Sequence, residues 1–315
     1  MAQQRESGDY NSNICLYNKS IDNLQKSQQH FMIYCNANIA ILMATYNGGK
    51  FLREQIDSLF AQTYQDWHLY VHDDGSNDNT VDIVQEYIEN YPNKITLMDY
   101  PPQGGACKNF LSMLEMVDAP YYMFCDQDDV WLSKKIKLEW EIITDEEIKN
   151  PQKPIIVNTD LMVVDAKLIE TNPSFWKYSG IYPQFAKEFK DYSALNVATG
   201  CTMLLNNSAK KCIKPYCDKT LMHDSWILFS VLSHKGILKS IHEATVLYRQ
   251  HENNTLGACN VNERTITNKL MNLRYVLRQN VLHYREMNAI QKVSIFSFIL
   301  AKLRYWGFII NYKQK

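Results

Sequence analysis

The chain has 315 residues and a mass of 36.8 kDa; 46% of its residues are hydrophobic and 21% are charged. This composition excludes a wholly disordered or collagen-like chain and predicts one large domain with an appendage. The 33 basic and 34 acidic residues nearly cancel, so the total charge identifies no partner. Their distribution is uneven, because residues 264–315 hold 10 basic residues and 1 acid, Glu286. A basic tail on an acidic body predicts contact with an anionic surface, and we expect no nucleic-acid partner.

The cysteines and the N-terminus point to the cytoplasm. The 8 cysteines contain no Cys-x-x-Cys pair and no Cys/His spacing typical of a zinc site. Cys125 falls in an apolar run, where buried free thiols are common. Residues 1–30 lack the apolar core of a secretory signal, so we expect a reducing environment. The apolar segment 294–311 is interrupted by Lys302 and Arg304, which leaves it short of a membrane span.

Apolar runs and helical spacing alternate along most of the chain. Residues 1–36 are rich in Gln, Asn and Ser and predict a poorly ordered extension with a short helix near 21–30. Residues 37–260 predict an α/β domain with a mostly parallel central sheet flanked by helices. The predicted strands are 39–44, 67–71, 95–98 and 121–125, and the predicted helices are 51–60, 80–89 and 109–116.

Polar clusters follow three of these strands at the points where the strands end. They are residues 45–47, the pair Asp73 and Asp74, and residues 126–129. Ligands of open α/β sheets bind beyond the carboxyl ends of the strands, so we expect the clusters to share one rim. Asp73 and Asp74 could belong to a turn that leads into a helix. A carboxylate at this place can also accept the N3–H of a uracil or thymine ring.

The third cluster, residues 126–129, suits a divalent cation. Asp126, Asp128 and Asp129 place three carboxylates within four residues, which repel one another unless a cation is present. Hard oxygen ligands select Mg²⁺ or Mn²⁺, and a diphosphate would complete the coordination shell. The alternative is a solvated acidic turn before a helix that starts near Ser133. Apolar residues on both sides of the cluster disfavour that alternative.

Residues 44–48, 58–64, 73–80 and 126–131, in this order and spacing, resemble family 2 glycosyltransferases with the GT-A fold. The resemblance covers about residues 38–257 and implies a nucleotide-activated sugar as substrate. It also implies a divalent cation, Mg²⁺ or Mn²⁺, as cofactor. The roles it implies are base contacts for Thr45 and Tyr46 with Asn47 beside them, a pyrimidine bond for Asp74, a ribose or metal contact for Asp126, and metal ligation for Asp128.

The resemblance also implies a catalytic base. Asp224 lies in the segment 222–226, which opens an apolar helical stretch, and related inverting enzymes have their general base at this place. Without the resemblance, an aspartate stabilised by a helix dipole is the better interpretation of Asp224. The subgroup often has two aromatic residues after the base, whereas Ser225 here precedes a single one, Trp226, expected on the acceptor side.

Two further segments resemble bacterial rhamnosyltransferase-like members that build surface polysaccharide, and a third resembles the family as a whole. Residues 104–110 add Lys108 and Asn109 to the expected nucleotide-sugar site. Residues 248–257 add Arg249 and His251 near the diphosphate, although a surface turn is the simpler alternative. Residues 196–201 resemble an acceptor-side strand in which Gly200 permits close approach of the sugar.

The implied reaction is inverting, metal-dependent transfer of a sugar, with rhamnose suggested by the subgroup, from a dTDP- or UDP-sugar. The acceptor would be a saccharide or a lipid-linked oligosaccharide. One alternative is a catalytically silent GT-A scaffold that binds nucleotide in an assembly complex. Another is a nucleotidyltransferase, which usually needs a Gly-rich phosphate loop with a basic residue, and residues 45–49 lack one.

The tail, residues 261–315, predicts two basic amphipathic helices. Apolar residues between 264 and 287 fall on an arc of about 140°, and residues 294–310 are apolar around most of the helix. Such helices could lie in an anionic leaflet on the inner face of the plasma membrane. They could instead pack on the catalytic domain or pair between subunits. The residues on the arc are Leu270, Leu273, Val276, Leu277, Val281 and Tyr284.

Overall fold

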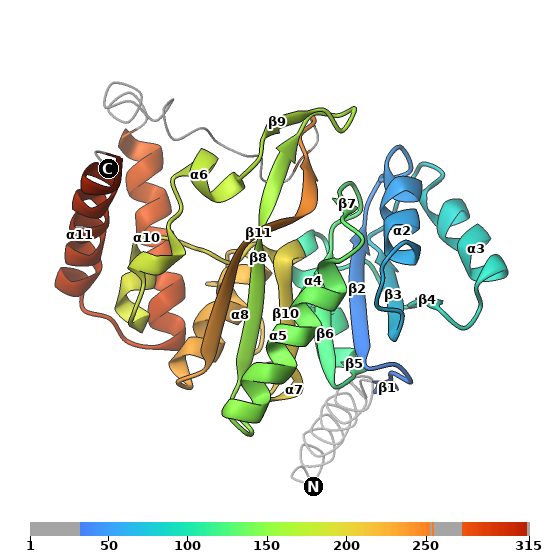
Figure 1. Cartoon of the computed structure of the whole chain (residues 1–315), viewed down its shortest axis with the longest axis horizontal. Coiled ribbons are helices and arrows are strands. Elements are labelled where there is room, and N and C mark those ends of the chain that lie inside the picture. The colour runs from blue at the N-terminus through green and yellow to red at the C-terminus, as the bar shows by residue number, and fades with distance from the viewer. Residues whose placement is uncertain (1–31, 253, 255–272, 314–315) are drawn as a thin grey trace, which may run out of the picture.

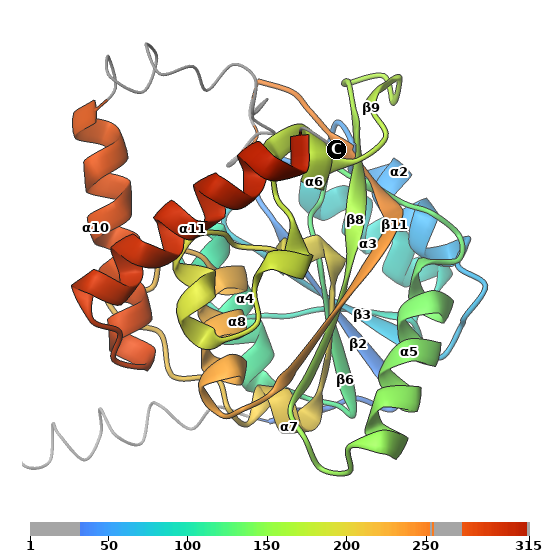
Figure 2. The same ribbon diagram turned by 60° about the vertical axis from the view of Figure 1, so that its left-hand side comes forward.

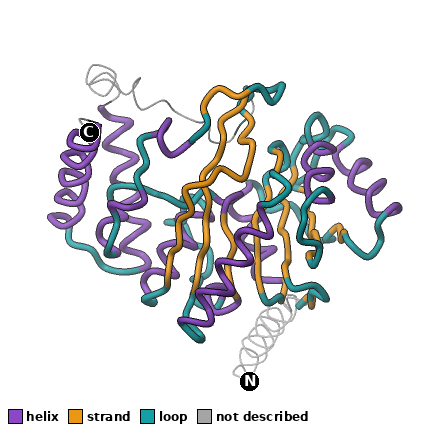
Figure 3. The backbone as a smooth tube through the Cα atoms, in the orientation of Figure 1, coloured by secondary structure: helices purple, strands orange, loops and turns teal. Residues whose placement is uncertain are grey.

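The computed structural model describes residues 32–252, 254 and 273–313. Within this part of the chain, a nine-stranded sheet carries helices on both faces (Figures 1 and 3). A second sheet pairs β1 (Ile33–Tyr34) with β5 (Val117–Asp118). The predicted helix at residues 21–30 lies outside the described residues.

The large sheet has the strand order β4-β3-β2-β6-β10-β8-β11-β7, with β9 paired to β8. Most of its paired residues are in parallel ladders, as the sequence predicts, whereas β10 runs antiparallel to both of its neighbours. The strands are β2 (Ile39–Thr45), β3 (Trp67–Asp73), β4 (Ile95–Leu97), β6 (Tyr121–Cys125), β7 (Val130–Trp131), β8 (Ile155–Val164), β9 (Glu170–Asn172), β10 (Met203–Asn206) and β11 (Ile237–Arg249).

The central strands are apolar on both faces because helices cover both. Successive side chains of a strand point to opposite faces, so β2 contributes Ala40 and Leu42 to one core and Ile41 and Met43 to the other. The first core includes residues of α4 (Ala106–Met116), α8 (His223–Ser233), α10 (Leu273–Ile290) and α11 (Ile295–Lys313). The second includes residues of α2 (Leu52–Phe60), α3 (Thr80–Asn90) and α5 (Lys135–Lys149).

Four short helical segments complete the described part: α6 (Phe175–Ser179), α7 (Asn207–Lys210), and two of the 3-10 turns, η1 (Pro183–Phe185) and η2 (Phe189–Ser193). The predicted helix at 109–116 begins earlier, at Ala106, directly after Gly105. The predicted strand at 196–201 is wrong. Its last two residues open a third 3-10 turn, η3 (Gly200–Thr202), and the strand β10 starts only at Met203.

Both tail helices pack on the domain. Helix α10 contacts α8 and η2, and α11 contacts η2. The predicted apolar arc is not buried, because Leu277 and Val281 are exposed and Val276 and Tyr284 are half-buried. The buried apolar residues of α10 are Met287 and Ile290, which the arc did not include. Leu270 lies outside the described residues. No helix in the described ranges is long and apolar enough to cross a bilayer.

Candidate active site

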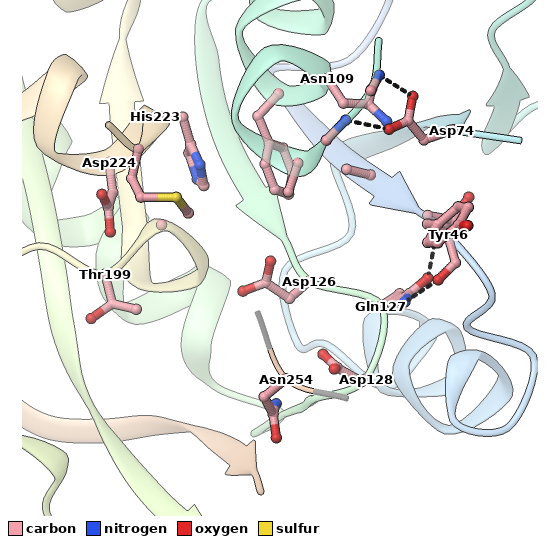
Figure 4. Close-up of a pocket in the computed structure, with 18 of the residues that line it drawn as sticks. Tyr46, Asp74, Asn109, Asp126, Gln127, Asp128, Thr199, His223, Asp224 and Asn254 are labelled. Carbon is pink, nitrogen blue, oxygen red and sulfur yellow. Dashed lines mark hydrogen bonds between the residues drawn. The ribbon is translucent and has the colours of Figure 1, made fainter. Parts of the chain in front are cut away.

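A cleft of about 580 Å³ opens beyond the carboxyl ends of β2, β3 and β6 (Figure 4). These strands are parallel neighbours, so the polar residues that follow them meet at one rim. The cleft has the size of a pocket for a small organic ligand. Among the predicted residues, those that line it are Thr45, Tyr46, Asp74, Asn109, Asp126, Asp128, Gly200 and Asp224.

Asp74 holds the loop that leads into α4. Its carboxylate accepts hydrogen bonds from the backbone N–H groups of Gln103, Gly104 and Gly105, with 3.0 Å to the nitrogen of Gly104. Gly104 and Gly105 have φ values of 75° and 136°, a backbone conformation that other residues rarely adopt. Figure 4 shows Asp74 and Tyr46 on the side of the cleft opposite Asp224 and His223.

Gln127 joins the loop after β6 to the loop after β2. Its side-chain oxygen accepts from the N–H of Tyr46 and its side-chain nitrogen donates to the Tyr46 carbonyl, each at 2.9 Å. Thr45 donates from its hydroxyl to Asp73 at 2.8 Å, and Asp73 in turn accepts from the N–H of Ser76. These bonds fix the backbone around the Tyr46 side chain, which remains 54% exposed.

Asp126 and Asp128 lie in the middle of the cleft. The Oδ2 atom of Asp128 is 2.8 Å from Nε2 of His251. Burial and the charge of Asp128 both raise the pKa of the Asp126 carboxyl. A cation between the two carboxylates would relieve this repulsion, so the pair suits a hard divalent ion.

A second acidic cluster lies deeper than this pair. Ligand atoms of Asp126, Asp129 and Cys201 lie within 4.8 Å of one another. Burial and the charges of the two aspartates raise the pKa of the Cys201 thiol well above its usual value, so the thiol stays protonated. Hard cations also prefer oxygen to sulfur. Asp129 is fully buried, whereas Asp126 and Asp128 both line the cleft, so these two are the carboxylates that a cation in the cleft can reach.

Asp224 stands in the first turn of α8, at the other end of the cleft. Burial raises the pKa of its carboxyl to about 6, although N–H groups of Ser225 and Gly200 favour the charged form. His223 beside it is buried and neutral, because burial lowers the pKa of its imidazole to about 3. A carboxyl with this pKa is charged at pH 7 and is a stronger base than an exposed aspartate.

Glu286 connects the tail to the loop that carries Asp224. Its side chain extends from α10, is fully buried, and accepts from the N–H of Leu221 at 2.8 Å and from the Ser225 hydroxyl at 3.0 Å. Burial raises the pKa of the Glu286 carboxyl to about 7. The start of α8 is therefore positioned by a residue that lies 61 positions after Ser225 in the chain.

Gly200 makes room for the His223 ring. A Cβ atom added at Gly200 would lie 2.2 Å from Nε2 of His223, far inside the contact distance. The ring cannot retreat easily, since its centroid is 4.3 Å from that of Phe110 and 5.2 Å from that of Phe124. Gly200 therefore lets the turn η3 approach α8 closely, in addition to lining the cleft.

We therefore expect Gly200→Ala to lower the free energy of unfolding by about 1–3 kcal/mol, the usual range for overpacking. Urea unfolding followed by circular dichroism measures this change. Gly307→Ala is the matched control, because no atom lies within 4 Å of the added Cβ on α11. The control should be neutral or stabilising by up to about 1 kcal/mol. Equal stability of the two variants would contradict the packing argument.

Five predicted site residues do not line the cleft. One is His251, which contacts Asp128, and the other four have partners elsewhere. Asn47 joins the loop after β2 to the loop after β3, because its side-chain oxygen accepts a hydrogen bond from the N–H of Asn77. Lys108 has its ammonium group 5.3 Å from the centre of the Tyr216 ring. Trp226 is a core residue, 1% exposed, whose indole donates to the Lys214 carbonyl.

The fourth, Arg249, is a buried clamp. Its guanidinium donates to the carbonyls of Asp128 and Ala166 at 2.7 and 2.8 Å and pairs with Glu54. Its backbone N–H donates to Asp129 at 3.0 Å. These partners turn Arg249 away from a direct diphosphate contact and make it a residue that holds the acidic loop in place.

Sequence reasoning missed three residues that shape the site: Gln127, His223 and Glu286. Gln127 lies inside the acidic cluster, and its position between two aspartates is the signal that could have drawn attention to it. His223 directly precedes Asp224, but nothing in the sequence indicates that its ring packs over Gly200. Glu286 is the single acid among residues 264–315, and this isolation could have drawn attention to it.

A mostly parallel α/β sheet with helices on both faces, and a cleft with acidic clusters at the strand ends, is the architecture of the GT-A fold. Solved structures agree on the fold. The mannosyltransferase PcManGT from Pyrobaculum calidifontis, in complex with GDP-Man and Mn²⁺, has a TM-score of 0.57 at 13% identity, covering 87% of this chain and 70% of that one. S. aureus TarS 1–349 in complex with UDP-GlcNAc has a TM-score of 0.55 at 14% identity, covering 85% and 71%.

The sequence comparisons give the family. The model of glycosyl transferase family 2 matches residues 40–213, and the chain belongs to this family. It is 32% identical over 228 residues to the dTDP-rhamnosyl transferase RfbG of Shigella flexneri, covering 69% of this chain and 74% of that protein. It is 26% identical over 185 residues to the UDP-Glc:alpha-D-GlcNAc-diphosphoundecaprenol beta-1,3-glucosyltransferase WfgD of Escherichia coli, covering 59% and 62%. The family and fold expected from the sequence are confirmed.

Proposed function

We propose that this chain is an inverting, metal-dependent glycosyltransferase of bacterial surface polysaccharide synthesis. It transfers a sugar from a dTDP- or UDP-activated donor to a saccharide or lipid-linked oligosaccharide acceptor. The observation that carries the proposal is the single cleft lined by Asp74, Asp128 and Asp224. The names of the two relatives support these substrate classes, and dTDP-rhamnose is the first donor to test.

The donor lies along the cleft from Asp74 to Asp126. Thr45 and Tyr46 flank the base, and Asp74 accepts the N3–H of the pyrimidine with lone pairs that the loop 103–105 leaves free. Asp126 and Asp128 hold the divalent cation, Mg²⁺ or Mn²⁺, with His251 beside Asp128. When bound, the cation supplies Lewis-acid stabilisation of the charge that develops on the leaving diphosphate.

Asp224 is the general base. An acceptor hydroxyl has a high pKa and attacks the anomeric carbon only if a group within hydrogen-bond reach takes its proton. The carboxylate of Asp224 accepts this proton as the new glycosidic bond forms and the bond to the diphosphate breaks. Attack from the face opposite the leaving group inverts the anomeric centre, and no second carboxylate is needed as a nucleophile.

The place of action is the cytoplasm, at the inner face of the plasma membrane. The tail, residues 264–315, holds 10 basic residues and 1 acid, which favours anionic lipid over neutral surfaces. A lipid-linked acceptor would be presented at that surface.

A panel of nucleotide sugars tests the proposal through thermal unfolding in the presence of Mn²⁺. A ligand that binds the native state at 100 times its Kd adds about 2.7 kcal/mol of stability, which raises Tm by roughly 5 °C in a chain of this size. We expect this shift with dTDP-rhamnose or a UDP-sugar and none with GDP-mannose, the purine control. Equal shifts with purine and pyrimidine donors would contradict the role of Asp74.

Product analysis completes this test. Sugar transfer with the stabilising donor distinguishes an enzyme from a silent nucleotide-binding scaffold, which would show the thermal shift without product. The anomeric configuration of the product, measured by NMR coupling constants, should be opposite to that of the donor. Retention of configuration would refute the inverting mechanism.

A further inference from the structure

Helix α11 lies on the outside of the molecule (Figure 2), and its exposed side carries a row of large apolar side chains. Seven large apolar side chains on it are between 40% and 73% exposed. At 100° per residue they span an arc of about 140°, and between residues 295 and 310 this arc contains no charged residue. The α11 apolar face consists of Ile295, Phe296, Ile299, Leu300, Leu303, Trp306 and Ile310.

The opposite side of α11 fixes the helix to the domain, so the exposure is not that of a loose tail. Phe298, Ala301 and Tyr305 are buried. The Tyr305 hydroxyl donates to the Gly180 carbonyl at 2.6 Å and accepts from the N–H of Tyr182 at 3.0 Å. One face of α11 therefore packs on the domain, and the opposite apolar face is open to a binding partner.

The exposed charges of α10, α11 and the segment between them have a single sign. Among described residues 274–312, every charged side chain that is exposed is basic, and the acid, Glu286, is buried. On α10, Arg274, Arg278 and Arg285 form one stripe about 40° wide. Exposed Lys292 precedes α11, and Arg304 borders the apolar face while pairing with Asp191 at 3.1 Å.

We propose that the α11 apolar face inserts in the plane of an anionic bilayer, at the boundary between headgroups and acyl chains, with the arginine stripe of α10 against the headgroups. A helix with Trp, Phe and Leu on one face and basic side chains beside it has the character of an interfacial helix. Apolar faces of this extent are rare on free surfaces of soluble proteins.

A second copy of the chain fits this face less well. Joining two α11 apolar faces would bring the basic residues of both copies together, and no exposed acid on α10 or α11 in the described residues could neutralise them. An anionic lipid surface neutralises the same charges, and each basic side chain near that surface contributes about 1 kcal/mol to the binding free energy. The charge pattern therefore selects lipid over self-association.

Flotation of the full chain with vesicles tests this proposal. We expect binding to vesicles of phosphatidylglycerol and phosphatidylcholine at least tenfold stronger than to phosphatidylcholine alone, and weaker at high salt. Phe296→Ser combined with Leu303→Ser should weaken binding to the anionic vesicles at least tenfold. The matched control is Ile148→Ser combined with Ile169→Ser, which replaces exposed apolar residues far from α11 and should bind like the unchanged chain.

Two results would overturn the proposal. One is equal vesicle binding by the α11 double variant and its control. The other is a dimer that sedimentation equilibrium detects for the unchanged chain and for the control variant but not for the α11 variant. That result would assign the face to a second copy. Vesicle binding needs no donor, and transfer to a water-soluble acceptor should be unchanged in the α11 variant. The membrane contact and the proposed reaction can therefore fail separately.

Discussion

Asp224→Asn should lower the rate of sugar transfer by about 10²–10⁴-fold, the usual contribution of a positioned general base. The amide keeps the size of the side chain but cannot take the proton from the acceptor hydroxyl. Binding of the nucleotide sugar should change little, because Asp74, Asp126 and Asp128 line other parts of the cleft. Steady-state kinetics together with calorimetric titration of the donor measure both quantities.

The pH dependence supplies a control for this result. Because burial raises the pKa of Asp224 to about 6, the base is lost as the pH falls through about 6, and kcat/KM should fall with it. The residual activity of Asp224→Asn should lack this acid limb. Asp218→Asn changes an exposed aspartate in the loop before α8 and should leave both rate and pH profile unchanged. Transfer at the normal rate by Asp224→Asn would refute the assignment of the base.

Asp128→Asn should lower transfer at least about 100-fold and weaken donor binding that depends on Mn²⁺. The variant removes one of the two carboxylates, Asp126 and Asp128, that line this part of the cleft, and it leaves His251 beside a neutral amide. Titration of Mn²⁺ in the presence of dTDP or UDP measures the loss of affinity directly. Removal of the metal with EDTA should reproduce the loss of activity in the unchanged chain.

Asp82→Asn is the matched control for this variant, since Asp82 is an exposed aspartate in the first turn of α3. It should retain metal-dependent binding. Full activity of Asp128→Asn, or full activity of the unchanged chain after EDTA treatment, would contradict the metal site. Activity retained by Asp128→Asn but lost with EDTA would assign the cation to other ligands, such as Asp126 and Asp129.

The parts of the molecule that follow from local patterns were predictable. The apolar run of β2 requires helices on both faces, and the acids after β6 lie where open sheets bind ligands. Residues whose roles depend on distant partners were not predictable. The sequence suggested that Arg249 contacts the diphosphate. In the structure its guanidinium is bound instead by three partners, Asp128, Ala166 and Glu54.

The prediction of a strand at residues 196–201 was wrong for a related reason. The family resemblance implied a strand here, but Gly200 packs closely against the His223 ring and opens a 3-10 turn. The tail was only half predictable, because an apolar arc on a helix does not say whether protein or lipid covers it. Leu277 and Val281 remained outside, while Met287 and Ile290 joined the core.

Glu286 limits how the proposed contact with lipid can be removed by truncation. A chain cut before α10 would lose the acceptor of the Leu221 N–H and the Ser225 hydroxyl, both of which support the turn that bears Asp224. Such a fragment would be impaired in solution as well as on vesicles, so its inactivity would say nothing about the need for a bilayer. Only exchanges of outward side chains on α11 can make a detached form whose chemistry is intact.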